Sequence, residues 1–140
     1  MSRNLYRAQK KTIAACTERW DWAAHGTPVT TPTGLVYLIR TASADTTHAQ
    51  PGDAVAWTGD IRLLDSTVCF AFSSDEPLIF RIDRADVPSG FHELARALAS
   101  GDSAEALLPS YLGWGLSGHA PEVPPDAILW VRIRQQWADS

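Results

Sequence analysis

The segment at residues 108–133, LPSYLGWGLSGHAPEVPPDAILWVRI, constrains the fold of this chain more than any other. It begins with a Pro-Ser turn and a Tyr/Trp pair, then crosses a loop rich in glycine and proline. Its last part consists of residues 124–126 (Pro-Pro-Asp) and a strand that contains Ile128, Trp130 and Ile133. Because ordered loops held between a turn and a strand often carry function, we expect this segment to form the rim of a pocket.

The composition is that of an ordinary globular protein. The chain has 140 residues, of which 45% are apolar and 20% charged. This length is enough for one domain with a core and an attachment of roughly 25 residues. The net charge is −4, and only residues 7–11 are locally basic, which is typical of a solvated helix face. Nucleic acid is therefore not an expected partner.

The two cysteines, Cys16 and Cys69, have neither the spacing of a metal site nor that of a disulfide framework. We expect buried free thiols rather than a bridge, and no cofactor or metal. No apolar run approaches the ~20 residues of a membrane span, and no signal-peptide core follows Met1. The chain as given is expected to be soluble, either in the cytoplasm or in the cell envelope or periplasm after removal of a leader.

The N-terminal residues predict a helix. Ser2 or Asn4 can cap it, it runs to about Ala24, and Gly26 and Pro28 end it. An apolar stripe of this kind either docks on the host domain or mediates self-association, and we favour docking. The stripe consists of Leu5, Ala8, Thr12, Ile13, Cys16 and Trp20.

Residues 27–140 predict an α+β domain. Gly59 is expected to end a strand, residues 41–52 to form a polar surface loop, and residues 91–100 to form a short helix that Gly101 ends. Five or six antiparallel-looking strands with one late helix indicate a sheet wrapped on a helix. The expected strands are at residues 35–39, 54–57, 61–72, 78–82, 104–108 and 127–134.

The histidines give no catalytic motif. The chain contains no nucleophile elbow, no HExxH and no phosphate-binding glycine loop, so hydrolase chemistry is unsupported. The four histidines lie in polar loops, on the predicted short helix and in the glycine-rich rim: His25, His48, His92 and His119.

Aromatic residues are the stronger signal for a site. Trp57, Phe91 and Trp114 each lie close to a glycine in sequence, whereas Phe80 fits a plain aromatic core better. Backbone without side chains next to large rings suggests an apolar concavity, which suits ring-shaped groups such as proline. The neighbouring glycines are Gly59, Gly90, Gly113 and Gly115.

Six short segments follow one another in the order and spacing of a known family. They are residues 55–59 (Val-Ala-Trp-Thr-Gly), 65–67 (Asp-Ser-Thr), 86–91 (Asp-Val-Pro-Ser-Gly-Phe), 94–101, 109–115 (Pro-Ser-Tyr-Leu-Gly-Trp-Gly) and 123–129 (Val-Pro-Pro-Asp-Ala-Ile-Leu). Together they resemble the FKBP-type peptidyl-prolyl cis-trans isomerase domain. The resemblance implies an antiparallel half-barrel sheet wrapped around one short helix.

The resemblance also suggests how the chain is divided. Residues 31–37 are similar to the entry strand of bacterial members, which often carry a helical N-terminal extension. We therefore expect a helical extension at residues 1–26 and an FKBP-like domain at residues 27–140. Residues 65–69 are most similar to the branch associated with gliding motility, whose members are often lipoproteins.

The resemblance implies a proline pocket made of aromatic and aliphatic side chains. Trp57 and Trp114 would replace two wall tyrosines, and Phe91 would replace the tryptophan floor. The other implied pocket residues are Leu78 on a wall, Phe80 behind it, Val87 and Pro88 as the ligand-binding backbone pair, His119 and Val123 at the rim, Val131, and Phe70 at or next to the position of the family's acid.

The main departure from the family is that missing acid. The family has Phe-Asp after its Asp-Gly segment, and this Asp projects toward the twisted amide. Here the aligned pair is Cys69-Phe70, and a shift by one residue gives Phe70-Ala71, so neither alignment supplies a carboxylate. Asp75 is close in sequence, but a structural role is favoured for it.

The leading functional hypothesis is cis-trans isomerisation of X-Pro bonds with an apolar X. The missing acid is compatible with an isomerase of reduced activity. The rotation barrier is about 18–20 kcal/mol while the isomers differ by about 0.5–1 kcal/mol, so binding the twisted amide is sufficient and no cofactor is needed. Implied partners are proline-containing peptides, unfolded proteins and macrolide inhibitors. The alternatives are a non-catalytic proline-peptide-binding or chaperone module, and a scaffold that presents the N-terminal helix to a partner.

Overall fold

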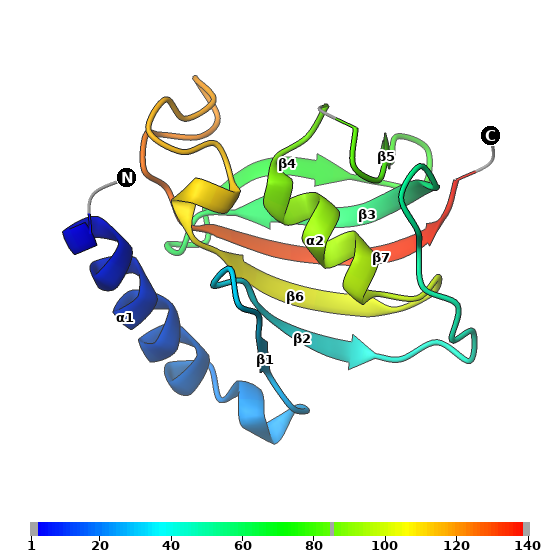
Figure 1. The fold of residues 1–140 in the computed structure, drawn as a ribbon, viewed down its shortest axis with the longest axis horizontal. Coiled ribbons are helices and arrows are strands. Elements are labelled where there is room, and N and C mark those ends of the chain that lie inside the picture. The colour runs from blue at the N-terminus through cyan, green and yellow to red at the C-terminus, as the bar shows by residue number, and fades with distance from the viewer. Residues whose placement is uncertain (1–2, 85, 139–140) are drawn as a thin grey trace.

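An antiparallel seven-stranded sheet lies between two α-helices in the computed structural model, which describes residues 3–84 and 86–138 (Figure 1). The sheet order is β1-β2-β6-β7-β3-β4, and β5 also pairs with β3. The predicted α+β class and wrapped sheet are confirmed, with the two-residue β1 as a strand that the sequence did not indicate. The strands are β1 Val29–Thr30, β2 Val36–Thr41, β3 Ala54–Arg62, β4 Val68–Phe72, β5 Leu78–Arg81, β6 Ser103–Leu108 and β7 Leu129–Trp137.

Strand β3 lies at the centre of the site-bearing half of the sheet. One edge of β3 pairs with β7 along nearly its whole length. The other edge pairs with β5 at residues 54–57 and with β4 at residues 59–62. The prediction that Gly59 ends a strand is wrong, because β3 continues to Arg62. Gly59 has a φ of +129°, and a Cβ there would collide with the backbone oxygen of Arg132 on β7. This glycine therefore marks a close approach of two strands.

The predicted extended run at residues 61–72 is interrupted. Leu63 N–H donates to the Thr67 carbonyl at 2.9 Å, and Ser66 has a φ of +76°. Asp65 stabilises this turn by accepting from Thr67 N–H at 2.9 Å. The turn reverses the chain, so β3 and β4 form a hairpin whose outer strand points its phenylalanines toward the loop after β6.

Helix α2 (Ser89–Ala97) lies across one face of the sheet and covers the main core (Figure 1). It begins two residues before the predicted start and ends at Ala97, because Leu98 is extended and Ala99 forms a bridge with His48. The loop at residues 41–52 is therefore not wholly a polar surface loop. Its Ala49 is buried in the same core.

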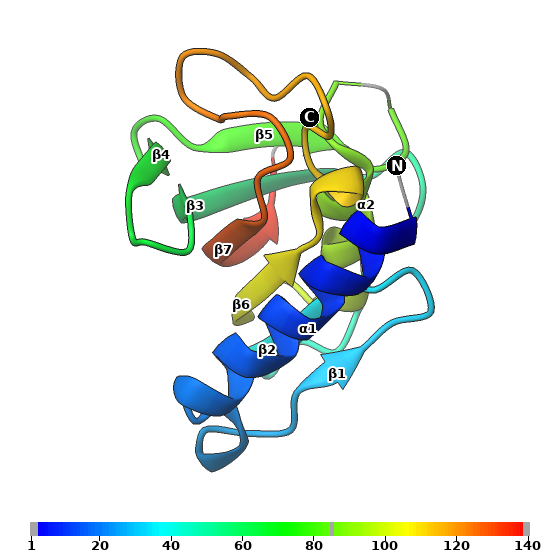
Figure 2. The ribbon, with the colours of Figure 1, turned by 90° about the vertical axis from the view of Figure 1, so that its left-hand side faces the viewer.

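The N-terminal segment packs on the other face of the sheet, where it runs alongside β2 and β6 (Figure 2). The predicted continuous helix is interrupted: α1 spans Arg3–Arg19, Asp21 is left-handed (φ 53°), and a 3-10 turn, η1, follows at Trp22–Ala24. Since α1 already includes Asn4, this residue is not the cap, and Ser2 lies outside the described residues.

Alternation along β6 separates the two cores. Leu108 faces the core under α2, whereas Leu107 faces α1 together with Ile13 and Cys16. Trp20 stacks on Trp130 of β7 with ring centroids 4.4 Å apart, which extends the contact to the next strand. Both faces of β6 and β7 are thus buried over part of their length, which explains the consecutive apolar residues at 106–108 and 129–131.

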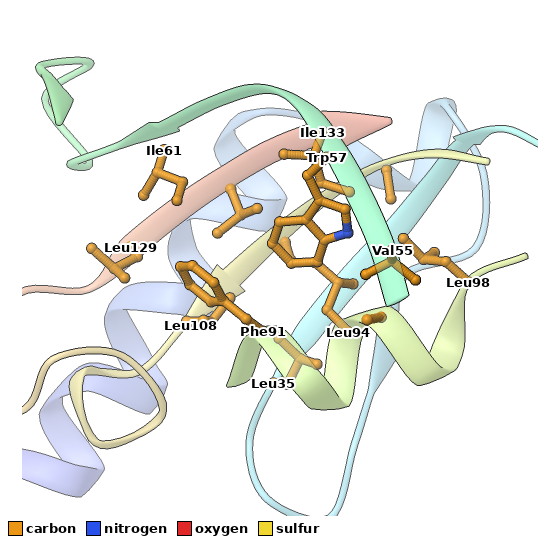
Figure 3. Packing of buried hydrophobic residues seen from close by; sticks show 14 of the residues in the cluster. Leu35, Val55, Trp57, Ile61, Phe91, Leu94, Leu98, Leu108, Leu129 and Ile133 are labelled. Atoms are coloured by element: carbon orange, nitrogen blue, oxygen red, sulfur yellow. The ribbon is translucent and has the colours of Figure 1, made fainter. Parts of the chain in front are cut away.

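One buried amide joins the strands to α2. Trp57 on β3 is fully buried and donates its Nε1–H to Gln135 Oε1 on β7 at 2.8 Å. Gln135 Nε2 donates in turn to the carbonyls of Ala95 and Leu98 at the end of α2, at 2.9 and 3.3 Å. Figure 3 shows Trp57 packed above α2 between Val55 and Phe91. This amide fixes the height of α2 over the sheet.

Replacement of Gln135 by leucine should lower the free energy of unfolding by about 2–4 kcal/mol, because it leaves the indole N–H and two helix carbonyls buried without partners. Urea denaturation followed by fluorescence measures the change. Gln136→Leu alters the exposed neighbour on β7 and should change stability by less than about 0.5 kcal/mol. Equal losses in the two variants would contradict this role of Gln135.

Candidate functional site

A cavity of about 270 Å³ opens between α2, the strands β4 and β5, and the loop that follows β6. Its size is just below the usual range of small-ligand pockets, about 300–1,000 Å³. Most of its lining is aromatic or aliphatic, with one carboxylate and one imidazole. The lining residues are Ile61, Phe70, Phe72, Leu78, Asp86, Val87, Phe91, Trp114 and His119.

Phe91 forms the floor of this cavity. It is only 1% exposed, and its ring lies 5.3 Å from Trp57 and 5.6 Å from Trp114, in an edge-on arrangement with the latter. Gly90 allows α2 to approach the chain after β6, since a Cβ there would lie 2.7 Å from the Leu112 carbonyl oxygen. This glycine serves close packing and does not open the concavity that its position beside Phe91 suggested.

The wall opposite α2 is a cluster of three rings. Trp114 lies 5.5 Å from Phe70 and 5.2 Å from His119, and Phe70 lies 5.7 Å from His119. The loop that carries Trp114 and His119 follows the 3-10 turn η2, Ser110–Leu112. His119 also forms a bridge with Val123, with both N–H···O distances at 2.8 Å. The cluster therefore joins β4 to this loop.

Six of the expected pocket residues line the cavity together, and five do not. Trp57, which the resemblance placed on a wall, is fully buried beneath Phe91, because its indole reaches down to Gln135. Pro88 is the N-cap of α2. Phe80 packs edge-on against Trp57 at 5.0 Å, and Val123 and Val131 are buried below the surface. Those that line it are Phe70, Leu78, Val87, Phe91, Trp114 and His119.

Three lining residues were not identified from the sequence: Ile61, Phe72 and Asp86. Phe72 shares a strand face with Phe70, with ring centroids 6.4 Å apart, so the alternation along residues 68–72 could have indicated it. Asp86 directly precedes Val87 and is the only carboxylate in the described lining. Asp75 is exposed in the turn between β4 and β5 and is not part of the lining.

Cys69 does not supply a nucleophile beside the cavity. Burial raises the pKa of its thiol above the ordinary value, and the negative charges of Asp65 and Glu122 raise it further. The thiol is therefore neutral near pH 7. Both cysteines are free thiols, but the predicted burial holds only for Cys16 on α1, because Cys69 is half-buried.

Other kinds of site have little support in the described part of the chain. Residues 3–84 and 86–138 contain no group of three His, Cys, Asp or Glu side chains placed to hold a metal ion. No helix within these ranges is long and apolar enough to span a membrane. A second cleft of about 190 Å³ lies between α1 and the β1–β2 edge, and none of the expected pocket residues lines it.

The fold and the aromatic cavity together define an FKBP-type domain, and the comparison with known families agrees. Residues 45–134 match the family described as FKBP-type peptidyl-prolyl cis-trans isomerase. The chain belongs to this family, as the sequence motifs predicted.

The crystal structure of FkpA from Escherichia coli is similar to this chain, with a TM-score of 0.72 and 26% sequence identity. The match covers 93% of this chain and 62% of that chain, so this sequence spans less than two thirds of its length. The similarity extends beyond residues 45–134 and takes in most of the described structure.

Proposed function

We propose that this chain catalyses cis-trans isomerisation of X-Pro peptide bonds with an apolar X, and that the proline ring occupies the cavity over Phe91. The observation that carries this proposal is the aromatic cavity itself. Phe91, Trp114 and His119 line it, and the resemblance to the family implies a proline pocket at these residues. Its substrates would be proline-containing peptides and unfolded proteins, and macrolide inhibitors would compete for the same space.

The chain's own groups account for the chemistry without a covalent step. An apolar enclosure disfavours the charge-separated resonance form that gives the amide its double-bond character, which eases rotation about the C–N bond. Phe91 and Trp114 hold the pyrrolidine ring, so that rotation moves the preceding residue past the rim. Val87, half-buried just before α2, lines the cavity, and the family resemblance assigns binding of the substrate carbonyls to its backbone. Tighter binding of the twisted amide than of either planar form then lowers the barrier.

We also propose that activity is reduced relative to family members that carry the acid. Phe70, at the position of that acid or next to it, points its ring into the Trp114–His119 cluster and offers no hydrogen-bonding group. Asp86 lines the cavity from the side of α2, and so from another wall than Phe70 on β4. Loss of one polar group that favours a transition state typically costs about 10–1000-fold in rate.

A non-catalytic proline-binding or chaperone module is the alternative function. The replacement of the acid by Phe70 favours it, because a larger apolar surface improves binding without aiding bond rotation. The two functions differ in one observable. Both bind a proline peptide, but only the isomerase increases the rate at which its cis and trans forms exchange.

The isomerase proposal predicts faster cis-trans exchange in Leu-Pro and Phe-Pro peptides, measured by NMR exchange or a protease-coupled assay. Trp114→Ala should reduce kcat/KM by about tenfold or more, because it removes one wall of the cavity. Trp137→Ala removes an exposed indole at the far end of β7 and should leave the rate unchanged.

Three outcomes are informative. Rates equal to the uncatalysed reaction at high protein concentration would reject the enzyme. Quenching of tryptophan fluorescence by a proline peptide without acceleration would support the binding module. Absence of any peptide binding would reject both functions.

The reduced-activity proposal predicts that Phe70→Asp has a kcat/KM about tenfold higher than Phe70→Asn, because only the carboxylate restores the missing acid. The two side chains have nearly the same size, so both variants lose the ring contacts with Trp114 and His119 to the same extent. Equal activity in the two variants, measured on one Leu-Pro peptide, would show that a carboxylate at this position contributes nothing.

A further inference from the structure

One polar side chain of α1 is buried against the loop that forms the cavity wall. Gln9 is 5% exposed, although it lies in the middle of a helix that otherwise buries apolar side chains. Its Oε1 accepts from the backbone N–H of Ser110 at 2.8 Å, and its Nε2 donates to Ser110 Oγ at 2.9 Å. Nε2 also donates to the carbonyl of Asp126 at 3.1 Å. Both polar atoms of this side-chain amide, Oε1 and Nε2, therefore form hydrogen bonds with the loop.

The two partners of Gln9 are the two ends of this loop. Ser110 opens η2 just after β6, and Asp126 precedes β7. The ends are also joined to each other through Gly115, whose N–H donates to the Ser110 carbonyl and whose carbonyl accepts from Asp126 N–H, each at 2.9 Å. The amide of Gln9 therefore closes the base of residues 110–126, a segment we call the rim loop.

The rim loop carries two of the cavity's lining residues, Trp114 and His119. Trp114 touches the floor at Phe91 and the ring of Phe70 in the same wall. Between its two ends, this loop contains three glycines, two of them with positive φ. A glycine-rich loop has many accessible conformations, so the position of Trp114 depends on how firmly its base is held.

We propose that Gln9 is a positioning residue for the proline cavity, and that α1 sets the distance between Trp114 and the floor through this amide. The proposal rests on the proposed function of the cavity. It gives the N-terminal helix a role in substrate binding, because the helix fixes the wall against which the proline ring packs. Hydrogen bonds that join segments 101 and 117 residues apart in sequence carry this coupling.

The test compares Gln9→Met with Ile13→Ala in the full chain. Methionine keeps the volume and helix propensity of glutamine but loses all three hydrogen bonds. Ile13 lies one helical turn further on, is 2% exposed and packs on Leu38 and Leu107, so its truncation weakens the attachment of α1 without removing a bond to the rim loop. Gln9→Met should raise KM for a Leu-Pro peptide about tenfold with a smaller change in kcat, and Ile13→Ala should leave KM within about twofold.

A third variant supplies a chemical rescue. When Gln9→Glu is protonated, its carboxylic acid again offers an acceptor to Ser110 N–H and a donor to Ser110 Oγ or the Asp126 carbonyl. A buried carboxyl group has a raised pKa, so binding by this variant should improve toward the wild-type value as the pH falls from 8 to about 5, on the scale of carboxyl pKa values raised by burial. Gln9→Met should show no such pH dependence.

Peptide Kd from tryptophan fluorescence is measured beside the rates, so that the two proposals can fail separately. Hydrogen exchange of the rim-loop amides gives a readout that does not require any substrate, and Gln9→Met should accelerate it about tenfold or more, whereas Ile13→Ala should not. Wild-type KM, Kd and exchange in Gln9→Met would overturn the positioning role. If the wild type binds no peptide but the exchange result holds, then the proposed function fails while the anchoring of the loop stands.

Discussion

The buried indole of Trp57 is the constraint on which the rest of the structure depends. A fully buried N–H requires a partner, and Gln135 supplies it while also satisfying two carbonyls at the end of α2. One amide therefore fixes three elements relative to one another. Phe91 packs against Trp57, so this hydrogen-bond network also sets the position of Phe91. The position of the cavity floor therefore depends on the core.

The cavity has two halves of different origin. The floor and the α2 side belong to the close-packed core, whereas Trp114 and His119 belong to a glycine-rich loop that is held by hydrogen bonds at its base and by ring contacts of Trp114. Phe70 bridges these halves from β4. Phe70, at or next to the position of the family's acid, contributes an apolar ring to the wall and offers no hydrogen-bonding group there.

Much of the architecture was predictable because alternation along residues 78–82 reports burial directly, and because the motifs occur in a fixed order. Three features were not. The sequence predicts a strand end at Gly59, but a glycine is required there because β7 approaches too closely for a side chain. Trp57 was assigned to a wall because nothing local reveals its bond to Gln135, 78 residues away. Gln9 is buried on the same face of α1 as Ile13 and Cys16, but it is polar and its partners follow more than 100 residues later.

Titration of a Leu-Pro peptide, followed by NMR at the backbone amides and the tryptophan indole N–H groups, tests the central claim most directly. The account predicts that the Trp114 signal shifts and saturates, with accompanying shifts at Val87 and His119, while the Trp57 signal changes little because Gln135 holds that N–H. Shifts confined to residues of the cleft beneath α1, such as Tyr6 and Tyr111, would place the ligand elsewhere. That result would contradict the assignment of the aromatic cavity as the proline site.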